Sequence, residues 1–287
     1  MRHHRLWGPK DGSSALKWTL RDYYESVFNR CAHEDCYSEG ERLTYNSYLL
    51  YQTNSFLSRQ LTVNCDTLWL DLGCGQADTS LYYAKRGVRP YLLDPAPSAV
   101  RLARRQFLAH GCTARVLQGD GFALAFREKT FDVIGCIGVL ENLPNSEQVV
   151  SEMGRVVKVG GVCFASIQIY TRMTVQSLVL PLAYLKGLLT RGVGGAHQYL
   201  QGYRECPHPV NAATPERYVQ MFTTAGFRHV KVWNLNFFPA LPLHGYVESL
   251  YVRLIGLVLK ARGAIGIAEP FATSTGFGKT LLIVSTK

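Results

Sequence analysis

A short glycine-containing turn between an apolar segment and a helical segment constrains this chain more than any other feature. Residues 68–72 are mostly apolar, Gly73-Cys74-Gly75-Gln76-Ala77-Asp78 follows, and residues 79–86 have helical character. Glycine lacks a Cβ and tolerates positive φ, so such a turn lets the backbone approach a ligand closely at the edge of a sheet. The pattern predicts a strand, a tight turn and a helix that together form a binding site.

Strand-like and helix-like segments alternate after this turn. The sequence predicts strands at residues 67–72, 89–93, 114–117, 131–136, 162–169, 227–236 and 280–284, and helices at 79–86, 98–109, 146–157, 214–225 and 246–261. Such alternation favours a parallel sheet with right-handed crossovers and helices on both faces. We therefore expect an α/β, Rossmann-like, doubly wound and mostly parallel sheet of seven strands.

The alternation divides the chain into four parts. Residues 1–62 are expected to form an N-terminal arm and a helical cap, with helices at 14–30 and 44–61. Residues 63–170 form the core that carries the glycine turn. The rhythm breaks at residues 171–213, which are interpreted as an insertion after the fifth strand. Residues 214–287 complete the sheet.

Length and composition agree with one elaborated domain. The chain has 287 residues, of which 47% are hydrophobic and 18% charged, and its net charge of +10 favours anionic partners. The first ten residues lack the apolar core of a secretory signal, and the sequence has no run of 18 uncharged apolar residues. We expect a cytoplasmic protein without a transmembrane segment that can also lie at a membrane surface.

The cysteines do not indicate a disulfide framework or a metal site. Eight cysteines occur without a Cys-x-x-Cys pair, and several lie within predicted strands, so reduced and mostly buried thiols are expected. Cys31, His33 and Cys36 are close in sequence, but no second ligand pair follows at zinc spacing. We therefore expect no metal.

The turn could in principle serve a dinucleotide, whose fingerprint is Gly-x-Gly-x-x-Gly or Ala. Asp78 occupies the third glycine position, where a carboxylate would repel a pyrophosphate at the helix N-terminus. A ligand without phosphate that carries a cation and an ammonium group fits better. An NAD-dependent oxidoreductase is thus the disfavoured alternative.

Five features in order make the chain resemble the class I S-adenosylmethionine (SAM) methyltransferases, with a core like that of the methyltransferase type 11 group. Residues 71–77 are similar to the family's first motif, with Ala77 in place of a frequent glycine, and Asp94 follows about 20 residues later. Residues 119–121, 131–143 and 152–161 are similar to the later motifs. The resemblance covers roughly residues 65–170, and residues 214–231 are similar to the family's C-terminal helix and strand.

This resemblance implies S-adenosyl-L-methionine as the cofactor and assigns contacts to it. Asp94 would accept hydrogen bonds from the ribose hydroxyls, and Asp120 one from the adenine amine. Gly73 and Gly75 would let the backbone pass the methionyl part. Asp71 is predicted to bind the cofactor as well: it would help to position the turn and would face the ligand's ammonium group. The remaining cofactor-binding residues are predicted to be Cys74, Pro95, Gly121 and Ile137. Alternatively, Asp94 caps a helix and Asp120 is an ordinary turn residue.

Methyl transfer from a sulfonium is an in-line displacement with a neutral leaving group, so placement and exclusion of water supply most of the rate. An alcohol or phenol acceptor would also need a base. Glu141, which follows the fourth strand, His197 and His208 are the candidate catalytic residues. The alternative that both histidines are surface loop residues is favoured over a catalytic role.

Substrate choice is expected to lie outside the core, in an acceptor-site lid at residues 171–213 and in residues 237–275. Both segments are apolar with scattered basic residues. The helix at 246–261 aligns apolar residues on one face, which suits either a membrane surface or lipid-like substrate, or core packing. We expect a small-molecule, lipid-like or glycan acceptor. An RNA methyltransferase remains an alternative, although no basic run interleaved with aromatics occurs, as does a catalytically silent SAM-binding module.

Overall fold

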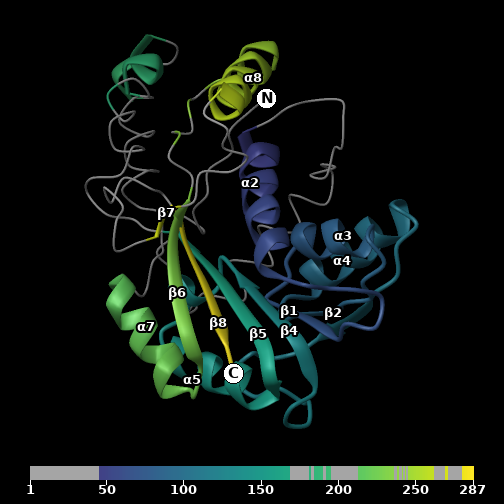
Figure 1. Ribbon diagram of the computed structural model, residues 1–287. Coiled ribbons are helices and arrows are strands. Elements are labelled where there is room, and N and C mark those ends of the chain that lie inside the picture. Colours follow the sequence, from purple (N-terminus) through teal and green to yellow (C-terminus); the bar gives the residue numbers. More distant parts are fainter. Residues whose placement is uncertain are drawn as a thin grey trace, which may run out of the picture.

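The computed structural model describes residues 45–168, 213–235, 245–261, 269–270 and 280–287, together with 181, 184–189, 192–194, 238, 241 and 243. These residues form one sheet in the order β3-β2-β1-β4-β5-β8-β6-β7 (Figure 1). Its strands are β1 (Trp69–Leu72), β2 (Tyr91–Asp94), β3 (Arg115–Gln118), β4 (Phe131–Ile137), β5 (Val157–Gln168), β6 (Arg228–Leu235), β7 (Glu269–Pro270) and β8 (Thr280–Thr286). The predicted fold is confirmed, and the two-residue β7 adds a short edge beside β6.

The sheet is mostly parallel, as predicted. Strands β1 to β5 pair in parallel, whereas β8 runs antiparallel to both β5 and β6. The crossovers of the parallel part carry α3 (Asp78–Ala84), α4 (Pro97–Ala109) and α5 (Ser146–Val156), and α7 (Pro215–Thr224) precedes β6. The chain moves outward from β1 to β3 and then returns to β4. A crevice for ligands forms at such a reversal of strand order.

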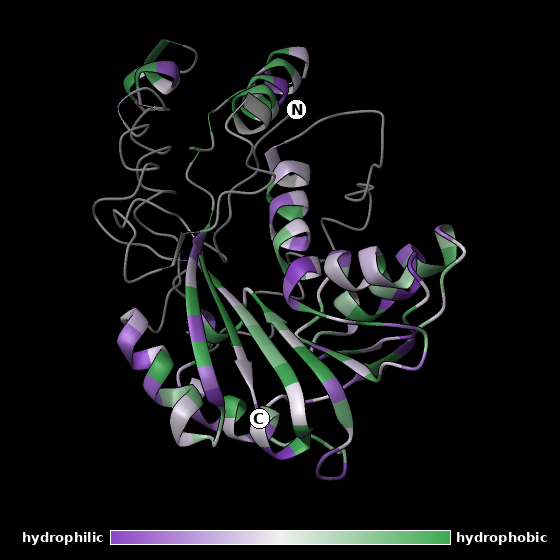
Figure 2. Ribbon diagram, viewed as in Figure 1, coloured by the Kyte–Doolittle hydropathy of each residue, from purple (hydrophilic) through white to green (hydrophobic). Residues whose placement is uncertain are grey.

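Helices cover both faces of the sheet (Figures 1 and 2). On one face Trp69 of β1 packs with Leu57 of α2 (Tyr45–Gln60), and on the other face the adjacent Leu70 joins the cluster that contains Met153 of α5. Successive strand residues point to opposite faces, so a strand that is buried on both sides has a continuous apolar sequence. This is why residues 68–72 are apolar apart from Asp71.

Strand β5 begins earlier than the sequence predicts. Val157 already pairs with Phe131, and regular pairing resumes between Val133 and Val162 after an irregular stretch that contains Gly160 at φ 77°. Residues 158–161 therefore form an irregular stretch within the strand, where its pairing with β4 is interrupted. A further difference is the short 3₁₀ helix η1 (Leu140–Asn142) after β4, where the sequence suggests only a loop.

Helix α8 (Tyr246–Ala261) packs on α2 at the upper end of the molecule (Figure 1). Val252 and Ile255 of α8 are buried against Tyr45 and Tyr48 of α2. None of the helices in the described part of the chain is long and apolar enough to span a bilayer.

Several predictions concern residues outside the described ranges. These are the helix at 14–30, the residues Cys31, His33 and Cys36, and most of the insertion at 171–213, including His197 and His208. The five described cysteines are free thiols, and Cys74, Cys136 and Cys163 among them are buried.

Candidate cofactor-binding site

A cavity of about 690 Å³ opens at the carboxyl-terminal ends of β1, β2 and β4. This volume lies within the range of small-molecule sites. The lining residues come from the glycine turn, the ends of β2 and β3 and the loop after β4. They are Gly73, Cys74, Gly75, Asp94, Pro95, Ala96, Gln118, Gly119, Asp120, Phe122, Ile137, Gly138, Val139, Asn142 and Leu143.

The glycine turn has a left-handed backbone, which explains its composition. Gly73 and Gly75 have φ values of 70° and 51°, and the amides of Gly73 and Cys74 both donate to the carbonyl of Leu93. A Cβ at residue 73 would overlap with Cγ2 of Val139. Ala77 also has a positive φ of 61°, although a side chain makes this conformation unfavourable. The positive φ explains why the family that this sequence resembles often has glycine at the position of Ala77.

Asp94 joins this turn to β2 and faces the cavity. Its buried carboxylate accepts hydrogen bonds from the amides of Gly75 at 3.0 Å and Ala96 at 2.9 Å, one on each oxygen. A carboxylate offers about four lone-pair positions, so each oxygen can accept a further hydrogen bond. Asp94 is not the N-cap of α4, because Ala96 occupies that position. The geometry suits two neighbouring hydroxyls of a ribose.

Asp120 lies at the other end of the cavity, after β3. Its Oδ1 accepts from the amide of Phe122 at 2.9 Å, which forms a local turn and leaves Oδ2 outside that turn. Gly121 is not among the lining residues; a Cβ there would meet Leu72 at 3.3 Å, so this glycine permits close packing on β1. The lining residue Phe122 was missed by the sequence analysis, although it directly follows a motif.

Asp71 lies beneath the turn and does not line the cavity. Its Oδ2 accepts from the Ser80 hydroxyl at 2.6 Å, and that hydroxyl accepts from Nε1 of Trp69 at 3.1 Å. Burial, with a smaller contribution from the charges of Asp94 and Asp78, raises the pKa of Asp71 to about 7, against the opposing effect of the Ser80 hydrogen bond. The network attaches α3 to β1, which agrees with a positioning role.

Asp78 is the first residue of α3, at the helix end where a dinucleotide would place its pyrophosphate. Burial raises its pKa to about 6, and its Oδ1 is buried and has no hydrogen-bond partner in the described structure. A phosphate next to this carboxylate would be repelled by its charge and crowded by its side chain.

Glu141 lies in η1 and is almost fully buried. Its Oε1 accepts from the amide of Gln168 at 3.0 Å, and burial raises the pKa of its carboxyl to about 7. It is not among the residues that line the cavity. Its contact ties the segment after β4 to the end of β5. The predicted roles of Glu141, His197 and His208 as general bases therefore stay predictions.

Two carboxylates and a glycine turn lie together where the strand order of the sheet reverses, an arrangement that is typical of Rossmann-like nucleoside-binding sites. The methyltransferase-domain family matches residues 70–165, which include the turn, Asp94, Asp120, the loop after β4 and most of β5.

The chain is also similar to methyltransferases of known name and to a solved structure. A demethylmenaquinone methyltransferase of Lactiplantibacillus plantarum is 30% identical over 191 residues, which cover 63% of this chain and 78% of that protein. A ubiquinone biosynthesis O-methyltransferase of Xylella fastidiosa is 30% identical over 131 residues, 45% of this chain and 52% of that protein. A solved SAM-dependent methyltransferase of Thermotoga maritima is 16% identical, with a TM-score of 0.53 and coverage of 92% and 99%, and supports the fold alone.

The chain belongs to the class I SAM-dependent methyltransferase family, whose cofactor is S-adenosyl-L-methionine. The match to the Xylella protein spans about half of that protein's length.

Proposed function

We propose that this protein transfers a methyl group from S-adenosyl-L-methionine to a small, apolar, lipid-like acceptor. The observation that supports this most directly is the position of the Asp94 carboxylate, which is fixed by two amides of the chain and still faces the cavity.

The residues around the cavity fit the parts of SAM. Asp94 would bind the ribose hydroxyls, and Asp120, with one oxygen outside its own turn, would accept from the adenine amine. Phe122 and Leu143 give the apolar surface that a purine ring needs. The left-handed turn at Gly73 and Gly75 brings backbone close to the methionyl part. When bound, the cofactor supplies a methyl group on a positively charged sulfur.

The chain contributes placement and exclusion of water. The loop after β4 fixes one wall of the cavity, since Asn142 donates to the carbonyl of Gly138 at 2.9 Å and Glu141 binds the end of β5. Because the sulfur leaves as a neutral group, the reaction gains most from a nucleophile held in line near the methyl group. Ile137, Gly138 and Val139 line this side of the cavity, where the acceptor would approach.

An apolar acceptor is supported by two observations. Both named relatives act, according to their names, in quinone chemistry. In addition, Ile137 packs against an apolar cluster that includes Phe56 and Leu57 of α2 and Leu235 of β6. The acceptor side of the cavity is thus bordered by hydrophobic rather than basic side chains, which does not favour RNA.

Asn54 of α2 is a buried polar residue between Leu50 and Leu57, and it is not among the residues that line the cavity. It is fully buried, and neither atom of its amide has a hydrogen-bond partner in the described structure. Leu50, one turn before it, packs near Cys74 and Ala77, whereas Leu57, one turn after it, joins the cluster that Ile137 contacts. We infer that Asn54 hydrogen-bonds a polar group of a bound ligand, because a buried amide without a partner is costly.

Transfer of labelled methyl from SAM into cell extract, followed by extraction and mass analysis of the product, tests the proposed function. We expect label in the organic-solvent fraction, and much less label with an Asp94→Ala variant when the SAM concentration is limiting. Label found only in RNA would show that the acceptor is RNA and not a lipid-like molecule. Binding of SAM without transfer to lipid, glycan, quinone or RNA fractions would instead identify a silent binding module.

A further inference from the structure

Helix α8 is apolar on the side that faces the protein and also on the side that faces solvent. Its inner residues Val252 and Ile255 are buried against α2. The outer stripe of α8 consists of exposed hydrophobic residues at helical spacing: Tyr246, Val247, Leu250, Leu254, Leu257 and Val258, with exposed fractions from 43% to 80%. Figure 2 shows these residues as part of a largely hydrophobic helix. A soluble surface helix normally carries polar residues on its outer side.

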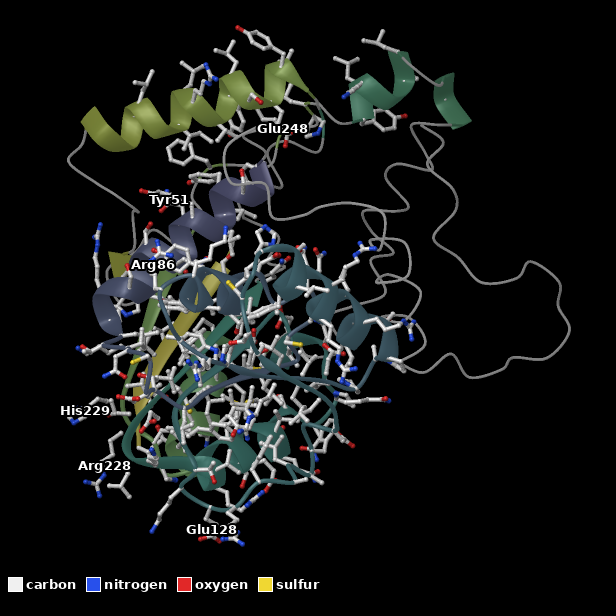
Figure 3. All side chains as sticks on the ribbon, turned by 90° about the vertical axis from the view of Figure 1, so that its right-hand side faces the viewer. Tyr51, Arg86, Glu128, Arg228, His229 and Glu248 are labelled. Carbon is white, nitrogen blue, oxygen red and sulfur yellow. The ribbon has the colours of Figure 1, made fainter. Side chains whose placement is uncertain are left out.

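The charges of α8 are distributed unequally between its two sides. Glu248 accepts a hydrogen bond from the amide of Tyr45 at 2.8 Å, so its carboxylate is turned toward α2 (Figure 3). Arg253 is exposed and lies at one edge of the outer stripe, one turn after Leu250 and one turn before Leu257. Among the α8 side chains that the structure describes, the solvent side therefore combines hydrophobic groups with positive charge. The whole chain has a net charge of +10.

The outer stripe lies at the same end of the molecule as the cavity. The parallel strands point with their carboxyl-terminal ends toward α8, and the helical pieces at 184–189 and 192–194 are at a similar height in both views (Figures 1 and 3). These pieces also expose hydrophobic side chains, namely Leu185, Leu189 and Val193. Two hydrophobic surfaces thus share the end at which an acceptor would enter.

We propose that the outer stripe of α8 docks on the surface of an anionic lipid bilayer. Hydrophobic side chains would enter the boundary between headgroups and acyl chains, and Arg253 would lie at the level of the anionic headgroups. This is surface binding, since α8 is not a membrane-spanning helix. Docking would bring the open end of the cavity close to lipid-soluble molecules, but it does not require that the methyl acceptor is one of them.

A second copy of the chain fits this stripe less well. Two copies related by a two-fold axis would place the middle of one stripe against the middle of the other. Arg253 lies halfway along α8 at one edge of the stripe, so a two-fold axis through the middle of the helix would bring two guanidinium groups near each other. An uncompensated like-charge contact of this kind disfavours the pairing.

Co-sedimentation of the full chain with vesicles tests the proposal. One set of vesicles is pure phosphatidylcholine, and the other is an equimolar mixture with phosphatidylglycerol. We expect the protein to sediment with the anionic vesicles, and the Leu250→Glu/Leu254→Glu variant to bind them at least about tenfold more weakly. Arg253→Ala should weaken binding at low salt and reduce its salt dependence.

Leu108→Glu is the matched control, because Leu108 is an exposed leucine of α4 outside the stripe. This control should bind as the wild type does. Unfolding curves and SAM calorimetry, which should be unchanged in the α8 variant, separate docking from cofactor binding. The proposal is overturned if the wild type ignores anionic vesicles, if the α8 variant binds equally well, or if sedimentation equilibrium shows a dimer that this variant dissociates.

Discussion

At the residue scale, the cofactor site depends on side chains that fix the backbone of the turn. Asp94 holds Gly75 from one side, and Ser80 holds Asp71 beneath the turn. Residue 73 must be glycine, because its positive φ and its close contact with Val139 both disfavour a side chain. In the proposed binding mode, the ligand would contact backbone whose position is fixed by buried acids.

Gly73→Ala tests whether the backbone of this turn matters for binding. A left-handed alanine costs about 1–2 kcal/mol, and its methyl group would also overlap with the Val139 side chain. We expect SAM affinity to fall about tenfold or more in calorimetry. The double variant with Val139→Ala should recover part of this loss, whereas Val139→Ala alone should change little. Full affinity in Gly73→Ala would contradict the arrangement described for the turn.

Glu141→Gln tests the buried carboxyl in η1. The pKa of Glu141 in the folded protein is about 7, above its usual value, so the folded state holds the proton more tightly than the unfolded state. Stability from this group is complete at acid pH and is lost as the pH rises through about 7. Glutamine keeps an acceptor for Gln168 without the charge. Between pH 5 and pH 8, the free energy of unfolding of the variant, measured in urea, should therefore rise relative to that of the wild type by about 1–3 kcal/mol.

A pH-independent difference between these two proteins would show that Glu141 is not held in its neutral form. The same variant also distinguishes a base from a positioning residue. Loss of methyl transfer with normal SAM binding and stability would support the base role, and retention of transfer would leave Glu141 with a structural role alone.

Asn54→Leu tests the inferred ligand contact of α2. Removal of a buried amide without a partner should raise the free energy of unfolding by about 1–2 kcal/mol. The KM for the acceptor or the cofactor should rise at the same time, while kcat changes less. Gln52→Leu is a suitable comparison, because Gln52 is a buried α2 residue that already donates to Tyr48. A stabilised Asn54→Leu protein with unchanged kinetics would assign Asn54 to packing alone.

At the scale of elements, hydrophobic pattern and helix punctuation predict most of the structure. Residues 97–109, 146–156 and 215–224 form helices close to the predicted ranges because each carries an apolar stripe. Thr214 caps the last of these helices, and Pro215 is its first residue. The irregular start of β5 could not be predicted from the sequence, because it depends on the pairing of Val157 with β4, which is distant in sequence. The strand β7 is too short for any sequence pattern.

Gly154 shows a packing requirement between elements that sequence alone hides. It lies within α5, and a Cβ there would be 2.6 Å from the carbonyl oxygen of Ala225, just after α7. Gly154→Ala should therefore force α5 and α7 apart and destabilise the protein by about 1–3 kcal/mol in urea unfolding, despite the better helix propensity of alanine. Gly256→Ala in α8, where nothing lies within 4 Å, should be neutral or stabilising. Equal effects at both positions would contradict this packing.

At the scale of the whole molecule, the site was predictable where it follows motifs and unpredictable where it depends on packing. Seven of the predicted cofactor residues line the cavity: Gly73, Cys74, Gly75, Asp94, Pro95, Asp120 and Ile137. Asp71, Gly121 and Glu141 lie behind the lining, because the direction of a side chain depends on neighbouring elements that a motif does not include. Asn54 and the outer stripe of α8 emerge only when α2 is placed against the sheet and against α8.

The central claim is that this cavity binds SAM through Asp94. Calorimetric titration of the full chain with SAM, in parallel with NAD, tests it most directly. The wild type should bind SAM and not NAD. Asp94→Ala should bind SAM at least about tenfold more weakly. Asp120→Ala should also bind SAM more weakly, and this change leaves the hydrogen bond between Asp94 and Gly75 in place. Glu128→Ala, at the end of the molecule opposite α8, should bind normally (Figure 3). NAD binding without SAM binding, or unchanged SAM affinity in Asp94→Ala, would contradict the account.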